Sequence, residues 1–125
     1  MLNLFCLQIE PRYLFWLAEY KKVIKARNLA LAKEDRTLIE VWSEKMIPLA
    51  VKIWQTRKKV LDLLNKNISS VLSFLYPDTN SAYISYQGLL LDSKRLEKNI
   101  SKNLKREIKM QRTLLGPHRD DLRFY

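Results

Sequence analysis

Residues 49–75 read LAVKIWQTRKKVLDLLNKNISSVLSFL, and this stretch decides the fold. Its apolar residues recur at spacings of three, four and seven positions, at Leu49, Ile53, Val60, Leu64, Ile68, Leu72 and Leu75. In an α-helix such spacings bring the side chains onto one stripe, which is buried against a partner helix. The stretch therefore predicts a helix over 49–76 that belongs to an antiparallel helical hairpin or short coiled coil.

The residues before this stretch predict two more helices, over 11–33 and 37–47. Pro11 suits the first position of a helix, where its missing N–H costs nothing. Thr37 and Glu40 have the spacing of a capping box, which starts the second helix. Pro48 is expected to kink or end that helix, because proline removes a backbone donor and clashes one turn back. The first helix carries an apolar stripe at Leu14, Leu17, Ile24 and Leu31.

The residues after the stretch predict a last helix over 92–111 and two short strands, over 83–87 and 113–115. Asp92 can cap that helix, whose apolar residues keep strict four-residue spacing at Leu96, Ile100, Leu104 and Ile108. The chain has only two glycines and four prolines, too few for an all-β protein with many tight turns. The fold class expected is mainly α, with a few short strands.

The sequence also limits where the protein works. The apolar run from Leu2 to Ile9 is too short for a membrane span and has no basic residues ahead of it, so it is not a signal peptide either. Cys6 is the only cysteine, which rules out an intramolecular disulfide and favours a reducing cytoplasm.

Positive charge is concentrated towards the end of the chain. The whole chain has a formal net charge of +10, and residues 94–125 hold ten Lys or Arg against four Asp or Glu, a net +6. A field of this kind attracts nucleic acid, anionic lipid or acidic protein, although a solvated lysine face is equally compatible with it. The helix predicted over 92–111 carries most of these residues and lacks the Trp and Phe anchors of a membrane-surface helix, so the membrane interpretation is the weaker one. The charge pattern itself does not distinguish nucleic acid from an acidic protein. The candidate DNA-binding residues are Lys94, Arg95, Lys98, Lys102, Lys105, Arg106 and Lys109.

The most distinctive stretch is TLLGPHRDDL at 113–122, in which a Gly-Pro pair predicts a turn. His118, Asp120 and Asp121 could ligate a metal, but three ligands within four residues of one loop do not easily converge. His-Arg-Asp also occurs in protein-kinase catalytic loops, but no glycine-rich loop or strand lysine accompanies it here. An ion-pair cluster at a turn is the preferred interpretation of these residues taken alone, with no metal site and no catalytic residue.

Residues 116–121 resemble the Gly-Pro-His-Arg-Asp-Asp motif of RecF proteins: Gly116, Pro117, His118, Arg119, Asp120 and Asp121. The first half of the chain agrees, since Pro11-x-Tyr13-Leu14-x-x-Leu17-x-x-Tyr20 and Arg27-Asn28-x-x-Leu31 are similar to the stretch that enters the arm of that family. Glu40-Val41-Trp42 resembles the start of the next arm helix. The resemblance covers nearly the whole chain, as motifs up to residue 42 and at 113–122, and as pattern over 43–112.

The resemblance implies that residues 1–112 form the helical arm and that residues 113–125 begin the return into an incomplete head of the ABC-type and chromosome-maintenance kind. RecF proteins act in DNA replication, DNA repair and the SOS response to DNA damage. Their heads self-associate around ATP and magnesium, and they bind single-strand/double-strand junctions. With recombination mediator proteins as partners they help load recombinase at gaps.

The ATP-binding parts of that family are expected to lie outside this chain, which is then an internal or truncated piece. The family head needs a Gly-x-x-x-x-Gly-Lys-Ser/Thr loop, a signature serine and a magnesium-binding aspartate. The only glycines here are Gly88 and Gly116, and neither is followed by Lys-Ser or Lys-Thr. The chain alone is therefore expected to hold no cofactor and to be no enzyme. An unrelated basic helical module that binds nucleic acid or an acidic protein is the alternative, and a metal-dependent enzyme around His118 is remote.

Overall fold

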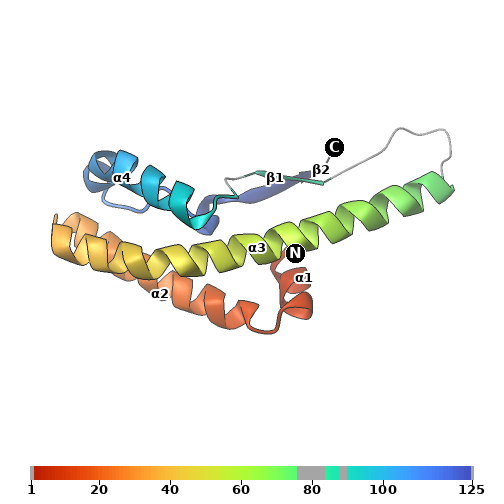
Figure 1. Cartoon of the computed structure of the whole chain (residues 1–125), viewed down its shortest axis with the longest axis horizontal. Helices are drawn as coiled ribbons and strands as arrows, with labels where there is room; N and C mark the ends of the chain where they lie inside the picture. The colour runs from red at the N-terminus through yellow and green to blue at the C-terminus, as the bar shows by residue number, and fades with distance from the viewer. Residues whose placement is uncertain (1, 76–83, 88–89, 125) are drawn as a thin grey trace.

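The computed structural model describes residues 2–75, 84–87 and 90–124 and shows an elongated, mainly helical molecule (Figure 1). Its elements follow in the order α1 (Leu2–Ile9), α2 (Tyr13–Ala32), α3 (Arg36–Leu75), β1 (Ile84–Gln87), α4 (Ser93–Met110), the 3-10 turn η1 (Pro117–Arg119) and β2 (Asp121–Phe124). The expected fold class is confirmed. None of the described helices combines the length and apolarity that spanning a bilayer requires.

Helices α2 and α3 form the expected antiparallel hairpin, joined by a tight turn at Lys33–Asp35. The helix start predicted at Thr37 is wrong by one residue, because Asp35 provides the cap. Its Oδ1 accepts a hydrogen bond from the Leu38 backbone N–H at 3.2 Å, and Glu34 before it takes a left-handed φ of 54°. An aspartate oxygen at this position satisfies one of the donors that a helix leaves free at its first turn.

The break expected at Pro48 does not occur, and α3 continues through it for 40 residues. Pro48 lies on the exposed side of the helix, where water can bond the carbonyl that proline leaves without a donor. Its neighbours on the other side are fully or almost fully buried in the core, at Met46, Ala50, Ile53 and Trp54. Burial of these side chains stabilises the helix by more than the proline costs. The second half of α3 extends beyond the other helices (Figure 1).

The apolar stripe expected on α2 is confirmed except at its first residue, since Leu31 is fully buried and Leu17 and Ile24 pack against the core. Leu14 is 60% exposed, whereas Tyr13, Tyr20 and Arg27 are buried. These three residues, seven apart, form one row along the helix, which we call the Tyr13–Tyr20–Arg27 row. Each side chain of the row carries a polar group into the interior, and each makes a hydrogen bond to another element.

The remaining predictions are confirmed in part. Asp92 caps α4 by accepting from the Arg95 backbone N–H at 2.9 Å, and the expected apolar ridge of α4 packs inward, with Leu96 and Ile100 buried. Strand β1 pairs antiparallel with β2, which begins at Asp121. The strand predicted over 113–115 is wrong, because that segment is irregular. Helix α1 was not predicted.

Candidate functional site

The Gly-Pro-His-Arg-Asp-Asp segment forms a sharp turn against α2 and α3. Gly116 has φ 137° and ψ 170°, a backbone conformation open in practice only to glycine. A Cβ atom at this position would also collide with the Tyr20 hydroxyl. Pro117 then starts the 3-10 turn and is buried. The glycine is thus required twice, by its torsion angles and by the close approach of Tyr20.

His118 links this turn to α2. Its Nε2 lies 3.0 Å from the carbonyl oxygen of Thr113, and its Nδ1 lies 2.7 Å from the Tyr20 hydroxyl. Because a carbonyl only accepts, Nε2 carries the proton and the Tyr20 hydroxyl donates to Nδ1. Burial, together with the charge of Asp120, raises the pKa of Tyr20 far above its ordinary value, so this hydroxyl stays a donor. The contacts therefore hold a neutral imidazole.

Protonation of His118 is expected to weaken the fold. Partial burial of the ring lowers the pKa of His118 below its ordinary value of 6.5, with the hydrogen bond to Thr113 as a partial offset. For a base whose folded pKa is lowered, the stability gained from the neutral form is complete above the unfolded pKa and declines as pH falls towards the folded pKa. The free-energy difference between the native chain and His118→Gln should therefore shrink between pH about 7.5 and about 5 in urea titrations. An unchanged difference would contradict a neutral, anchored His118.

The other charged residues of the motif have separate roles. Asp120 accepts a hydrogen bond from the Trp54 indole N–H at 2.5 Å, which ties the turn to α3. Arg57, also on α3, donates to the Pro117 carbonyl at 2.8 Å. Arg119 is exposed, and Asp121 enters β2 with a side chain outside the described set. Across the described residues, no three His, Cys, Asp or Glu side chains gather as a metal site would need. The motif thus fixes the turn to α2 and α3 by hydrogen bonds.

The strongest polar contact behind the turn joins Arg27 to Glu107. Both side chains are completely buried, and the guanidinium meets both carboxylate oxygens, at 2.9 and 3.0 Å. Arg27 also donates to Ser43 of α3 at 2.8 Å and to Thr113 at 2.9 Å. One guanidinium therefore connects α2, α3, α4 and the segment before the turn. A fork-to-fork pair of this kind is stronger and more directional than a single charged contact.

Side chains also satisfy the backbone of the irregular segment 113–115. Asn28 accepts from the backbone N–H of Thr113 at 2.7 Å, and Glu107 accepts from that of Leu114 at 2.9 Å. These donors would otherwise need a neighbouring strand. The absence of the predicted strand follows from this substitution of side-chain acceptors for backbone acceptors.

Sequence reasoning placed the motif residues together but missed their supports: Arg27, Asn28, Ser43, Trp54, Arg57 and Glu107. A charged residue in a helix normally faces solvent, so nothing in the local pattern predicts that Glu107 is buried. The available signal was the seven-residue spacing of Tyr13, Tyr20 and Arg27, which places an arginine on an otherwise aromatic row.

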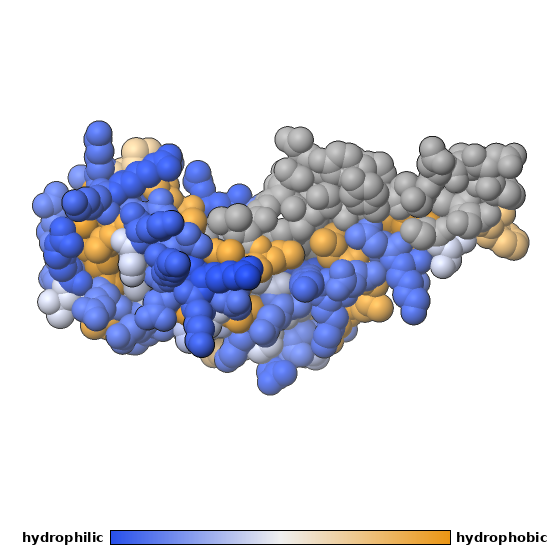
Figure 2. All heavy atoms as spheres, turned by 45° about the horizontal axis from the view of Figure 1, so that its top comes forward, coloured by the Kyte–Doolittle hydropathy of each residue, from blue (hydrophilic) through white to orange (hydrophobic). Residues whose placement is uncertain are grey.

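The candidate DNA-binding residues form a continuous basic face on α4. Lys94, Lys98, Lys102, Lys105 and Lys109 follow one another at three- or four-residue spacing, so they lie along one side of the helix for about 22 Å. All are exposed, as are Arg95, Arg106 and Arg112. Among the described residues, only Arg95 of this set has an ion-pair partner, Asp92 at 3.8 Å. Figure 2 shows the hydrophilic side chains that gather over this end of the molecule.

Comparison with known proteins gives one consistent result. No family model matches the chain. It is 34% identical to the DNA replication and repair protein RecF of Exiguobacterium sp. over 94% of its own length and 36% of the relative. It is 33% identical to RecF of Halothermothrix orenii, over 93% of the chain and 35% of the relative. The chain thus spans about a third of the length of the curated relatives it matches.

A solved structure of the recombination mediator protein RecF–ATP of the RecFOR pathway has the same fold over this region. The match has a TM-score of 0.85 at 24% sequence identity, and it covers 99% of the chain and 36% of the solved chain. A second structure, of RecF–ATPrS, matches with a TM-score of 0.80. The buried polar network and the basic helix therefore lie in a chain that corresponds to about a third of a RecF protein, in sequence and in fold.

Proposed function

We propose that the basic face of α4 contacts the phosphate backbone of DNA, as part of a RecF-type protein that acts at single-strand/double-strand junctions. The observation that carries this proposal is the row of five exposed lysines on one side of a single helix. Phosphate contacts require several cations on a rigid support, since the release of counterions provides much of the affinity. Recombination mediator proteins are the proposed partners, and help in loading recombinase at gaps is the proposed outcome.

The structure supports the required rigidity. The opposite side of α4 is fixed by Leu96 and Ile100 in the core and by the Arg27–Glu107 pair. Because Glu107 is neutralised inside the protein, Glu97 is the one acidic residue that α4 exposes. A helix held at this many points presents its lysines at fixed spacing, as recognition of a regular phosphate backbone demands.

Replacement of Lys98, Lys102, Lys105 and Lys109 by glutamine tests the DNA contact. Affinity for a single-strand/double-strand junction should fall irrespective of its sequence, because phosphate contacts do not distinguish bases. The slope of log K against log salt should become shallower by about 0.9 for each duplex phosphate contact removed. Both quantities are measured by fluorescence anisotropy over a series of salt concentrations.

The matched control replaces four exposed lysines on other surfaces by glutamine, namely Lys21, Lys33, Lys58 and Lys66. It has the same net charge as the α4 variant, so a diffuse electrostatic attraction would weaken equally in both. A contact surface on α4 requires the larger losses of affinity and slope in the α4 variant. Equal losses of affinity and slope in the two variants would mean that the lysines of α4 are only a solvated surface and do not contact DNA.

We also propose that ATP and magnesium are bound by parts of the RecF fold other than these 125 residues. Nucleotide binding in this class of ATPase uses backbone N–H groups of a glycine-rich loop and a lysine placed beside it. Gly116 is the one glycine in the described residues. Pro117 follows it in the chain, and the His118 ring, whose nitrogens contact Tyr20 and Thr113, lies beside it. This turn is occupied by Tyr20 and offers no cradle for a triphosphate.

A further inference from the structure

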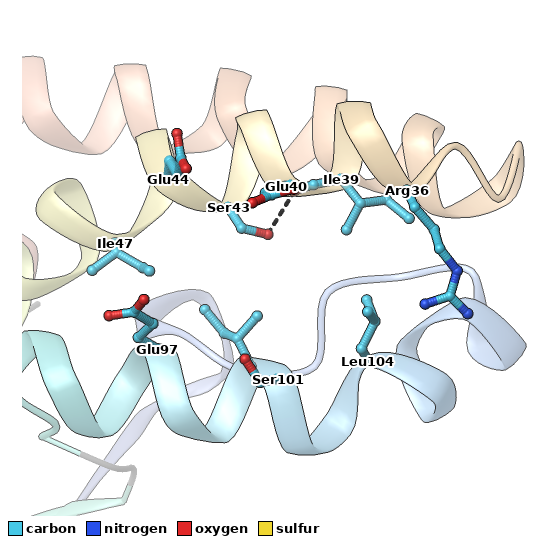
Figure 3. Close-up of a pocket in the computed structure, with 10 residues that line it drawn as sticks. Arg36, Ile39, Glu40, Ser43, Glu44, Ile47, Glu97, Ser101 and Leu104 are labelled. Carbon is cyan, nitrogen blue, oxygen red and sulfur yellow. Dashed lines mark hydrogen bonds between the residues drawn. The ribbon is translucent and has the colours of Figure 1, made fainter.

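The molecule has a second surface whose charge is opposite to that of the basic face. A hollow of about 380 Å³ lies between the first part of α3 and the middle of α4. Its floor is apolar, with Ile39 and Ile100 buried and Ile47 and Leu104 half-buried. Figure 3 shows Ile39 of α3 facing Leu104 of α4 across this hollow, and Ile47 of α3 at the other end, above Glu97 of α4.

Three exposed carboxylates border the hollow: Glu40 and Glu44 from α3 and Glu97 from α4. The chain has 23 Lys and Arg, yet within the described ranges none of the three makes an ion pair. Arg36 borders the hollow near Leu104, at the end away from Glu44 and Glu97 (Figure 3). The hollow thus has an apolar floor and one acidic end.

We propose that this hollow, the α3–α4 groove, binds a cationic amphipathic helix of a partner protein. Apolar side chains of that helix would lie on Ile47 and Leu104, and its Lys or Arg would pair with Glu44 and Glu97. A helix in an apolar groove with charges at the rim is a common mode of protein recognition. Charge complementarity sets partner choice in such interfaces.

Other occupants fit the groove less well. DNA and anionic lipid headgroups are repelled by the three carboxylates. A second copy of this chain could offer the lysines of its own α4, but the apolar ridge of that helix is already packed inside the protein. The groove and the basic face therefore take ligands of opposite charge, and the proposal goes beyond the DNA contact proposed above.

The test uses a fluorescent amphipathic peptide of about 14 residues, with Leu on one face and Lys flanking it, and the same peptide with Glu in place of Lys. The whole chain has a net charge of +10, so its diffuse field favours the Glu peptide. If the groove binds the peptide specifically, the Lys peptide should bind more tightly than the Glu peptide at physiological salt. We expect saturable binding of the Lys peptide, at least about tenfold tighter than the Glu peptide.

Two variants locate the site. Glu40→Gln/Glu44→Gln/Glu97→Gln should weaken the Lys peptide by about tenfold, since each removes one rim charge. The matched control Glu19→Gln/Glu34→Gln/Asp62→Asn removes the same charge elsewhere and should retain binding. Ser101→Trp, at an exposed position on the groove, should block the peptide without touching the core.

Three results would overturn the proposal: preferential binding of the Glu peptide, equal losses in the two triple variants, or unchanged binding in Ser101→Trp. Light scattering adds a fourth, since a mass that doubles in the native chain and not in Ser101→Trp would assign the groove to a second copy. DNA affinity of the groove variants is read in parallel. If the groove does not bind the peptide, the proposed DNA contact is still tested separately by that measurement.

Discussion

Arg27→Met should destabilise the fold by about 3–5 kcal/mol, because it leaves the carboxylate of Glu107 buried without a counter-charge. Both side chains have no exposed surface, so water cannot replace the lost guanidinium. Ser43 and Thr113 lose a donor in the same change. A loss of this size is a large part of the about 5–15 kcal/mol that stabilises an ordinary domain. Urea unfolding followed by circular dichroism measures it.

Two companion variants separate the buried pair from general effects of the substitution. Lys22→Met breaks the exposed Lys22–Glu19 pair and should cost only about 0–1 kcal/mol. Arg27→Met/Glu107→Met removes both buried charges and should be more stable than the single variant, since apolar replacement of a whole ion pair is often neutral. A double variant as unstable as Arg27→Met would show that the hydrogen bonds to Ser43, Thr113 and Leu114 dominate instead.

Gly116→Ala is the second change with a large expected effect, about 4 kcal/mol of destabilisation. The φ and ψ of Gly116 cost an alanine about 1–3 kcal/mol, and forcing a methyl group against Tyr20 costs a similar amount. The collision would also displace the Tyr20 hydroxyl from His118. The same urea titration reports the loss.

Tyr20→Phe separates the two causes. Alone it removes one hydrogen bond, at a cost of about 1 kcal/mol. In Gly116→Ala/Tyr20→Phe the methyl group no longer meets a hydroxyl, so the backbone cost, the lost hydrogen bond and the close approach of the methyl group to the His118 ring remain. The double variant should therefore be less destabilised than the two single effects combined, as expected for residues in contact. Strict additivity would mean that the turn adjusts without touching Tyr20.

The sequence predicted the helices well because local periodicity and caps act over a few residues. The Asp92 cap and the apolar ridge of α4 are of this kind. Pro48 was misjudged because its effect depends on which side of the helix faces water, and that depends on the packing of Met46 and Ala50. The residues around Pro48 do not show by themselves which side of the helix faces water. A break was therefore predicted at a position where the tertiary structure tolerates proline.

The candidate site was predicted as a motif but not as a network. The resemblance to RecF proteins marked Gly116–Asp121, and it also contained Arg27 and Asn28 without assigning them a role. Their partners lie 80 to 86 positions further along the chain. Contacts at such separations follow from the fold and cannot be read from spacing. The lysines of α4, in contrast, are exposed, and their binding to DNA remains a prediction.

The reach of Arg27 along the chain has a consequence for the order in which the molecule forms on the ribosome. Helices α2 and α3 contact each other through neighbouring parts of the sequence, so this hairpin can assemble as soon as it emerges. Until Glu107 and Thr113 follow, the Arg27 guanidinium has Ser43 but no counter-charge, and it must stay hydrated at an open seam. When α4 packs against the hairpin, Glu107 replaces that water around the Arg27 guanidinium. During synthesis from the N-terminus, the α2–α3 hairpin therefore forms first, and the buried Arg27–Glu107 ion pair forms after it.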